Sequence, residues 1–371
     1  MITTINNKHK KLNVPNLRFP EFQGEWITYK IKDVLSIGNG RDYKHLSNGE
    51  IPVFGTGGYM TSVDECLYDG ETTFIGRKGS INKPFYYNGK FWTVDTLFYT
   101  HSFNGITPKF TYCLFQTINW LKYNEASGVP SLSKDTIEKI KINIPELEEQ
   151  NKIAKLMFAL DERIATQSKI IEDLKKLKSA IIEKLYKEIQ GTWYSYRQLF
   201  SIINERNKQL EYLNVLSASQ ERGMVSREDL NLDIHFERSN ISTYKIVKNG
   251  DYVIHLRSFQ GGFAFAEKTG ICSPAYTVLR PNNLLVYGYL SNYFTSRDFV
   301  KSLIIVTYGI RDGRSINVDE WLDMKVVIPS KEQQTHIVNV IESIENKIKN
   351  EETYSNCLLN QKQYLLRQMF I

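Results

Sequence analysis

The side chains capable of catalysis are scattered along this chain rather than grouped. No Walker A loop is present, and residues 55–58 (Gly-Thr-Gly-Gly) lack the strand and helix context of a nucleotide loop, so we interpret them as a β-turn. Neither a methyl-donor glycine motif nor a tetrapeptide that would grip a flipped adenine occurs. No histidine has metal-ligand spacing; the histidines are His9, His45, His101, His235, His255 and His336. The sequence predicts a binding protein with no metal or cofactor of its own.

The loops offer a different chemistry, which is hydrogen bonding to a polar or anionic partner such as nucleic acid. Glycine-rich loops carry Arg, Lys, Gln and hydroxyl side chains. Arg and Gln can pair bidentately with guanine and adenine, each pair contributing roughly 1–3 kcal/mol of discrimination, whereas Lys44 and Lys78 suit phosphates. The candidate DNA-contacting residues are Lys44, Thr56, Tyr59, Arg77, Lys78, Ser80, Arg222, Arg257, Gln260, Arg311 and Arg314. The alternative for each is a solvated loop charge.

Two β-rich heads must position these loops, and we place them at residues 1–145 and 191–329. In the first, turn residues separate short runs at 51–54, 72–75 and 91–94, which is typical of strands. A short amphipathic helix is expected within 110–123. Residues 139–144 alternate with period two and predict a closing strand, which Pro145 ends.

Each head is followed by a segment that predicts a long helix, at 146–190 and 330–371. Acidic residues fill the first turn of the first helix, and apolar residues then recur in a four-three rhythm. A continuous helix over 146–189 would be about 66 Å long. The positions expected at the interface are Ile153, Leu160, Ile164, Leu174, Ile181, Ile337, Ile344, Ile348, Leu358 and Leu365. The alternative is two unrelated surface helices.

The chain repeats itself, because residues 131–186 align with 315–370 at a constant offset of 184 without a gap. The heads match more loosely; Trp26 resembles Trp193 at the start of each. A tandem duplication predicts pseudo-two-fold packing with antiparallel helices and a head at each end. The expected fold class is therefore α+β, with two β-rich domains separated by two long helices in an antiparallel coiled coil.

The charge is modest and lies in the heads. The chain has a net charge of +6, divided as +4 over 1–145, 0 over 146–190, +2 over 191–329 and 0 over 330–371. This distribution of charge weakly favours a polyanionic partner. The N-terminus has a short basic arm and no apolar signal core, and no run suits a membrane helix. The four cysteines (Cys66, Cys113, Cys272, Cys357) have no paired spacing, so we expect a reduced cytoplasmic protein.

The chain resembles the specificity subunits of Type I restriction-modification systems over essentially its whole length. The resemblance is carried by the helix start Pro145-x-x-Glu148-x-Gln150, which recurs at Pro329, and by the order head, helix, head, helix. Residues 51–58, 75–80 and 93–96 fit the same pattern. Residues 257–262 of the second head depart from the Arg-Lys-Gly-Ser form, so residues there are carried over less securely.

The resemblance implies a non-catalytic subunit with two target-recognition domains, each reading half of a split, asymmetric DNA sequence. The helices would set the spacing and dock two modification subunits that methylate adenine at N6. Restriction subunits would join the assembly. S-adenosylmethionine, ATP and magnesium would be bound by those partners, and no membrane is involved. On this interpretation residues 1–145 and 191–329 are the target-recognition domains, and 146–190 and 330–371 are the spacer helices.

Other interpretations remain open on the residues alone. The main rival is a coiled-coil scaffold whose heads bind proteins, which predicts no loss of DNA affinity at raised salt. An autonomous DNA methyltransferase would need a methyl-donor motif, and none is visible. A general nucleic-acid chaperone fits poorly with two heads that have diverged.

Overall fold

The computed structural model divides into two compact units, and each is described by itself. Unit 1 comprises residues 1–168 and 353–371, and unit 2 comprises residues 169–352. The described residues are 13–219, 222–230, 238–255, 262–308 and 315–371. Both long helices cross the boundary between the units, so the division into domains at 145, 190 and 329 stays a prediction.

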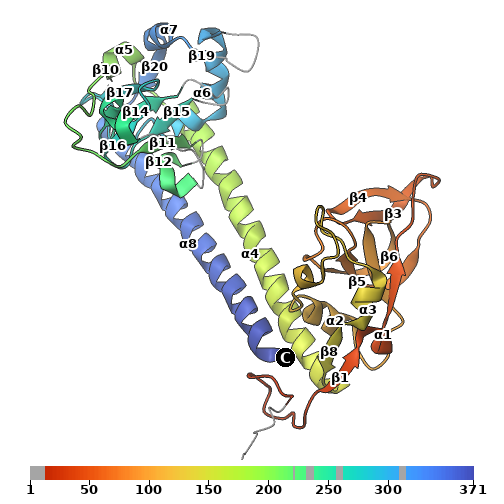
Figure 1. Cartoon of the computed structure of the whole chain (residues 1–371). Coiled ribbons are helices and arrows are strands. Elements are labelled where there is room, and N and C mark those ends of the chain that lie inside the picture. Colours follow the sequence, from red (N-terminus) through yellow and green to blue (C-terminus); the bar gives the residue numbers. More distant parts are fainter. Residues whose placement is uncertain (1–12, 220–221, 231–237, 256–261, 309–314) are drawn as a thin grey trace, which may run out of the picture. The chain divides into compact units, whose positions relative to one another are not determined.

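Unit 1 is built on a six-stranded sheet in the order β2-β7-β5-β6-β3-β4 (Figure 1). A separate two-stranded ribbon, β1 with β8, joins the head to α4. The elements are β1 Ile27–Lys30, α1 Ile31–Val34, β2 Ser36–Asn39, β3 Asn48–Gly55, β4 Gly58–Val63, β5 Tyr68–Gly76, β6 Phe85–Thr93, β7 Leu97–His101, α2 Pro108–Phe115, η1 Trp120–Tyr123, α3 Lys134–Lys139, β8 Lys141–Ile144 and α4 Leu147–Lys187.

The sequence pattern accounts for most of these elements. The predicted runs at 51–54, 72–75 and 91–94 lie in β3, β5 and β6. The expected helix within 110–123 is instead two pieces, α2 and η1. Helix α2 begins because Pro108 occupies its first turn and the Thr107 hydroxyl accepts a hydrogen bond from the Phe110 N–H at 3.3 Å. Its buried face packs into a core that also contains Ile153 and Met157 of α4.

Unit 2 has a smaller four-stranded sheet in the order β10-β17-β14-β15, surrounded by two-stranded pairs. Its core includes Tyr196 stacked on Trp321 at 4.3 Å between ring centroids. The elements are β9 Thr192–Ser195, α5 Tyr196–Leu199, β10 Phe200–Ile203, β11 Leu216–Ser219, β12 Gly223–Ser226, η2 Arg227–Leu230, η3 Arg238–Thr243, β13 Lys245–Val247, β14 Tyr252–Ile254, β15 Phe263–Phe265, β16 Gly270–Cys272, β17 Thr277–Pro281, η4 Tyr293–Thr295, α6 Arg297–Ser302, η5 Leu303–Val306, β18 Thr307–Tyr308, β19 Ser315–Ile316, α7 Val318–Asp323, β20 Lys325–Ile328 and α8 Lys331–Met369.

Helices α4 and α8 run antiparallel in both units, which confirms the predicted fold class of β-rich heads with a helical coiled coil. In unit 2, Lys178 pairs with Glu345 at 2.5 Å and Lys175 with Glu352 at 2.7 Å. In unit 1, Lys362 of α8 pairs with Asp161 of α4. The Lys175–Glu352 pair is exposed and contributes little stability, whereas the side chains of Lys362 and Asp161 are partly covered.

The apolar residues predicted at the interface of the long helices are largely covered by other residues. Ile153, Leu160, Ile337, Ile348 and Leu358 are buried, and the other five predicted positions are partly buried. Near the end of α4 the buried residue is Ile182 and its neighbour Ile181 is only partly covered, because Ile182 packs into the core of unit 2. No helix in the described ranges has the length and apolarity required to cross a membrane.

The match of Trp26 with Trp193 is wrong by two residues. The ribbon in unit 1 pairs Ile27 with Ile144, and the one in unit 2 pairs Thr192 with Ile328. Trp26 therefore corresponds to Gly191. The two tryptophans also differ in environment, since Trp26 is 2% exposed and Trp193 is 65% exposed.

Candidate DNA interface

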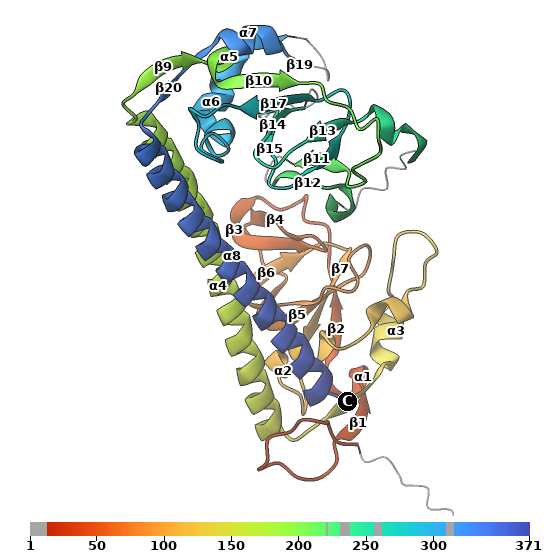
Figure 2. The same cartoon turned by 90° about the vertical axis from the view of Figure 1, so that its left-hand side faces the viewer.

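Five loops of unit 1 are linked to one another by backbone hydrogen bonds and close approaches, and we call them the loop cluster. In Figure 2 the hairpin of β3 and β4 lies in this part of the head, away from β1 and α1. The loop cluster consists of Gly40–Arg41, Gly55–Gly58, Arg77–Ser80, Val94–Thr96 and Pro130–Ser131. Backbone hydrogen bonds hold these loops together, so the side chains between them are positioned by the fold.

The loop at Arg77–Ser80 is the centre of the cluster. The Arg77 N–H donates to the Thr96 carbonyl at 2.8 Å, and the Gly79 N–H donates to the Pro130 carbonyl at 2.8 Å. Gly79 adopts a φ of 85°, a left-handed conformation that favours glycine. The Arg-Lys-Gly-Ser sequence therefore forms a turn anchored on both sides.

Arg77 is half-buried and already engaged within the protein. Its guanidinium donates to the Asp95 carbonyl at 3.3 Å and lies 5.8 Å from the centre of the Phe98 ring. These contacts hold the guanidinium in place without neutralising it, because neither partner is a carboxylate. Lys78 and Ser80 on either side of Gly79 are exposed.

The hairpin at Gly55–Gly58 is the β-turn that the sequence predicts, with Gly55 paired to Gly58. A Cβ on Gly79 would lie 3.8 Å from the Thr56 hydroxyl, so the hairpin and the Arg77–Ser80 loop are neighbours. Tyr59 is 65% exposed, and its hydroxyl lies 3.1 Å from that of Ser62. Thr56 therefore lies beside the Arg77–Ser80 loop, and Tyr59 is exposed on β4, the strand that follows the hairpin turn.

Lys44 lies outside the loop cluster, in the exposed segment between β2 and β3. Sequence reasoning missed a nearer basic side chain, Arg41, which is exposed. The Arg41 N–H donates to the Thr93 carbonyl at 2.8 Å, and its carbonyl accepts from the Trp92 indole at 2.9 Å. The preceding Gly40 was the available signal, because a Cβ there would lie 1.9 Å from the Val94 carbonyl oxygen.

Of the DNA-contacting residues predicted in unit 2, one lies within the described residues. Arg222 is exposed in the turn before β12, where Gly223 has a φ of 66°. The remaining four, Arg257, Gln260, Arg311 and Arg314, lie outside the described residues. Another arginine of this head, Arg280, is structural, since it donates to both carboxylate oxygens of buried Asp251 at 2.9 Å.

The connection between head and long helix, which we call the joint, has the same hydrogen bonds in both units. In unit 1 the buried Gln150 side chain donates to the Pro145 and Gly105 carbonyls and accepts from the Thr107 N–H, each at 2.9 Å. In unit 2 the buried Gln334 repeats all three bonds. It donates to the Pro329 and Leu284 carbonyls at 3.0 Å and accepts from the Val286 N–H at 2.8 Å. The repeated motif thus fixes how each helix leaves its head.

No cluster of three or more His, Cys, Asp or Glu side chains suited to a metal ion occurs within the ranges the structure describes. Burial raises the pKa of the Cys113 and Cys272 thiols to about 12, so neither is poised as a nucleophile near neutral pH. The arrangement supports binding through polar and basic loops.

Comparison with known proteins agrees with this geometry. Residues 23–176 match the family model for the Type I restriction modification DNA specificity domain. A putative type I specificity subunit of Mycoplasma pneumoniae is 29% identical over 192 residues, covering 49% of this chain and 73% of that protein. A putative type I restriction enzyme specificity subunit of Methanocaldococcus jannaschii is 23% identical over 403 residues, covering 92% and 91%.

Two solved structures share the fold. The S subunit of a type I restriction-modification system from M. genitalium superposes with a TM-score of 0.61 at 13% identity, covering 96% of this chain and 99% of that one. A chain from a study of complex assembly in the type I restriction-modification system has a TM-score of 0.59 at 15% identity, covering 93% and 97%.

Proposed function

We propose that this chain, which belongs to the specificity subunits of type I restriction-modification systems, reads a two-part asymmetric DNA target with one half assigned to each head. DNA recognition is the function of the family. The observation that carries the two-part assignment is the repeated joint, because Gln150 and Gln334 make the same three bonds to heads that otherwise differ.

In the first head, the loop cluster is the proposed reading surface. Arg77 is the residue best placed to contact a base, because its two internal contacts limit the rotamer freedom that binding would otherwise cost. Lys78, Lys44 and the added candidate Arg41 are exposed and suit phosphates. Thr56, Tyr59 and Ser80 supply hydroxyl groups beside them.

In the second head, Arg222, Arg257, Gln260, Arg311 and Arg314 remain the proposed contacts. Arg222 is supported by its exposure in a turn. Arg280 is not added, because its charge is committed to Asp251.

The long helices are the proposed docking element for two modification subunits, and restriction subunits would join the complex. This chain is the non-catalytic recognition component. Adenine methylation and DNA cleavage would be performed by the partners, which would bind S-adenosylmethionine, ATP and magnesium. The cytoplasm is the proposed location, supported by the unpaired spacing of the cysteines.

Co-expression with the modification subunit followed by genome-wide mapping of methylated adenines tests the function. We expect one two-part sequence to be modified. Lys78→Ala should weaken DNA binding, while Lys32→Ala on α1, exposed and away from the loop cluster, should leave it unchanged.

Salt dependence separates this function from that of a protein-binding scaffold. Phosphate contacts require the logarithm of the DNA association constant to fall linearly with the logarithm of the salt concentration. Absence of this fall, together with no modified sequence, would favour the scaffold.

A further inference from the structure

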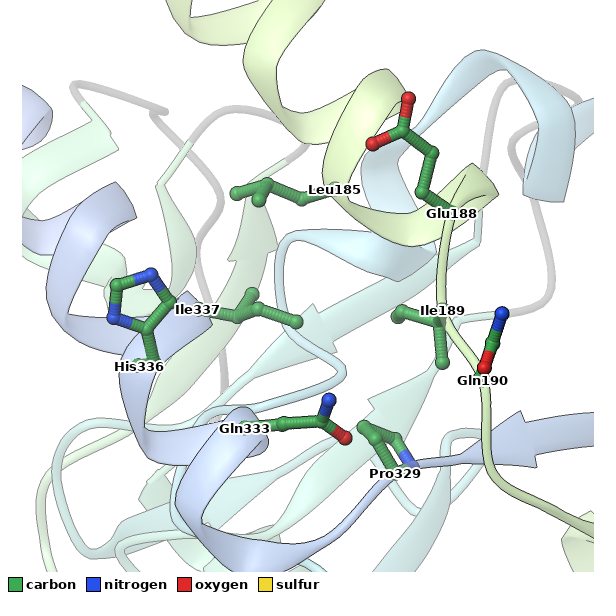
Figure 3. A pocket seen from close by; sticks show the side chains of 8 residues that line it. All are labelled: Leu185, Glu188, Ile189, Gln190, Pro329, Gln333, His336 and Ile337. Carbon is green, nitrogen blue, oxygen red and sulfur yellow. The ribbon is translucent and has the colours of Figure 1, made fainter.

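Unit 2 contains a pocket of about 270 Å³ where the end of α4 meets the start of α8. Leu185, Ile189 and Ile337 supply apolar surface, while Glu188, Gln333 and His336 supply polar groups. Figure 3 shows the α8 side chains on one side and those of the α4 end and the following connector on the other. Small-molecule sites usually start near 300 Å³, so this pocket suits one or two side chains rather than a cofactor.

The sequence repeat identifies the counterpart of this pocket in unit 1. At the offset of 184, Gln333 corresponds to Glu149 and His336 to Lys152. In unit 1 this surface is covered by the segment at residues 13–25, which we call the strap. The strap bends at residues 16–17 and turns at residues 20–21, where the Phe22 N–H donates to the Phe19 carbonyl at 3.2 Å. Arg18 of the strap pairs with both oxygens of buried Glu149 at 2.7 and 2.8 Å, and Phe19 lies 4.7 Å from the Lys152 ammonium.

The strap is fixed at several further points within unit 1. Glu21 pairs with Lys152, and the Leu17 N–H donates to the Gln368 carbonyl at 2.9 Å. Beyond the strap, Trp26 packs against Phe370 at the end of the chain. The strap and the C-terminal residues 368–370 together therefore cover this surface in unit 1.

Among the described residues of unit 2, no segment corresponds to the strap, because the connector between α4 and β9 is short. Only residues 188–191 separate the end of α4 from the start of β9. Four residues span at most about 14 Å. The connector uses this length to pass from helix to strand, which leaves the surface around Gln333 and His336 open.

We propose that this pocket binds a short peptide segment of a partner protein that carries an aromatic side chain next to a basic one, as the strap carries Phe19 next to Arg18. The aromatic ring enters the apolar part beside His336. The basic side chain pairs with Glu188. It cannot pair as Arg18 does in unit 1, because the counterpart of Glu149 in unit 2 is the neutral Gln333. The inference concerns peptide docking and stands independently of the DNA-reading function.

A labelled synthetic peptide with the sequence of residues 14–24 is the probe. In unit 1 the tethered strap has a high effective concentration on its own site, so added peptide reports on the pocket of unit 2. We expect saturable binding to the full chain by fluorescence anisotropy. His336→Trp, which fills the pocket from an exposed position, should weaken binding at least about tenfold, and Glu188→Lys should do likewise.

Two controls separate loss of the pocket from a general effect of charge or from misfolding. Glu183→Lys makes the same change of charge at an exposed position in the last turns of α4, outside the pocket, and should leave peptide binding unchanged. Circular dichroism establishes that each variant folds. Equal binding by the wild type, H336W and E188K, or no binding at all, would overturn the proposal. DNA binding should be the same in all four proteins, so failure here is distinguishable from failure of the proposed function.

Discussion

Arg77 shows how a side chain can be held in position before any ligand binds. Its guanidinium is placed by one carbonyl and one aromatic ring, and neither removes its positive charge. Lys78 beside it is exposed. Adjacent basic residues in one loop therefore suit different tasks, because only the first is held in a defined direction.

Arg77→Ala and Lys78→Ala should consequently weaken DNA binding in different ways. Arg77→Ala should cost roughly 1–3 kcal/mol of discrimination at one base pair, which appears as relaxed specificity there. Lys78→Ala should weaken binding to all sequences equally. It should also make the slope of the logarithm of the association constant against the logarithm of the salt concentration shallower, by the amount expected for about one fewer phosphate contact. Binding measurements on a panel of single-base variants at several salt concentrations distinguish the two effects. Identical behaviour of the two variants would contradict these assignments.

The cysteines provide a test of burial in both units. Cys113 and Cys272 are buried with a pKa raised to about 12, whereas Cys66 and Cys357 are exposed. The thiolate is the reactive form, so we expect a disulfide reagent at mildly alkaline pH to label Cys66 and Cys357 in the folded chain. Cys113 and Cys272 should react only after denaturation. Rapid labelling of Cys113 in the native state would show that the core of unit 1 is open.

At the scale of elements, the sequence predicted what depends on local pattern and repetition. The two long helices and the hairpin at 55–58 follow from periodicity and glycine placement. The closing strand was predicted at 139–144 and forms at 141–144, because Lys139 ends α3. The bonds of Gln150 could not be predicted, although its match to Gln334 was visible. Its head-side partners, Thr107 and Gly105, lie in a loop with no recognisable counterpart in the sequence of the second head.

Arg41 escaped prediction for a related reason. Its place in the loop cluster depends on contacts with Thr93 and Trp92, which are about fifty residues away. The shift from Ile181 to Ile182 likewise depends on tertiary packing, because the end of α4 enters the core of unit 2. Local pattern defines the elements, whereas long-range contacts decide which of their residues meet.

Replacing each joint glutamine tests whether the joint stabilises its unit. Gln150→Leu and Gln334→Leu each remove three hydrogen bonds and leave buried backbone groups without partners. Each backbone group left without a partner costs roughly 1–3 kcal/mol of folding free energy. We expect both variants to have a lower free energy of unfolding in urea. Gln361→Leu, exposed on α8, is the control and should change it little. A joint variant as stable as the control would show that water replaces the lost partners.

At the scale of the whole molecule, the duplication has preserved the joints and the helices while the heads have diverged. Both joints use the same glutamine, yet one head is built on a six-stranded sheet and the other on a four-stranded sheet. This contrast is the one expected if, as proposed, the two heads read different sequences and the helices connect them in the same way. The connection should therefore set spacing, and the heads should set sequence.

Lengthening the helices tests that division of roles. Four residues inserted after Ile170, with four more after the corresponding Tyr354, add about 6 Å of helix, close to two base-pair steps. We expect the unread gap in the methylated target to grow by one or two base pairs while both half-sites stay the same. Four residues inserted after Glu211, in an exposed loop of unit 2, should leave the gap unchanged. Methylation mapping in complex with the modification subunit provides the measurement, and an altered half-site with an unchanged gap would reject the role of the helices in spacing.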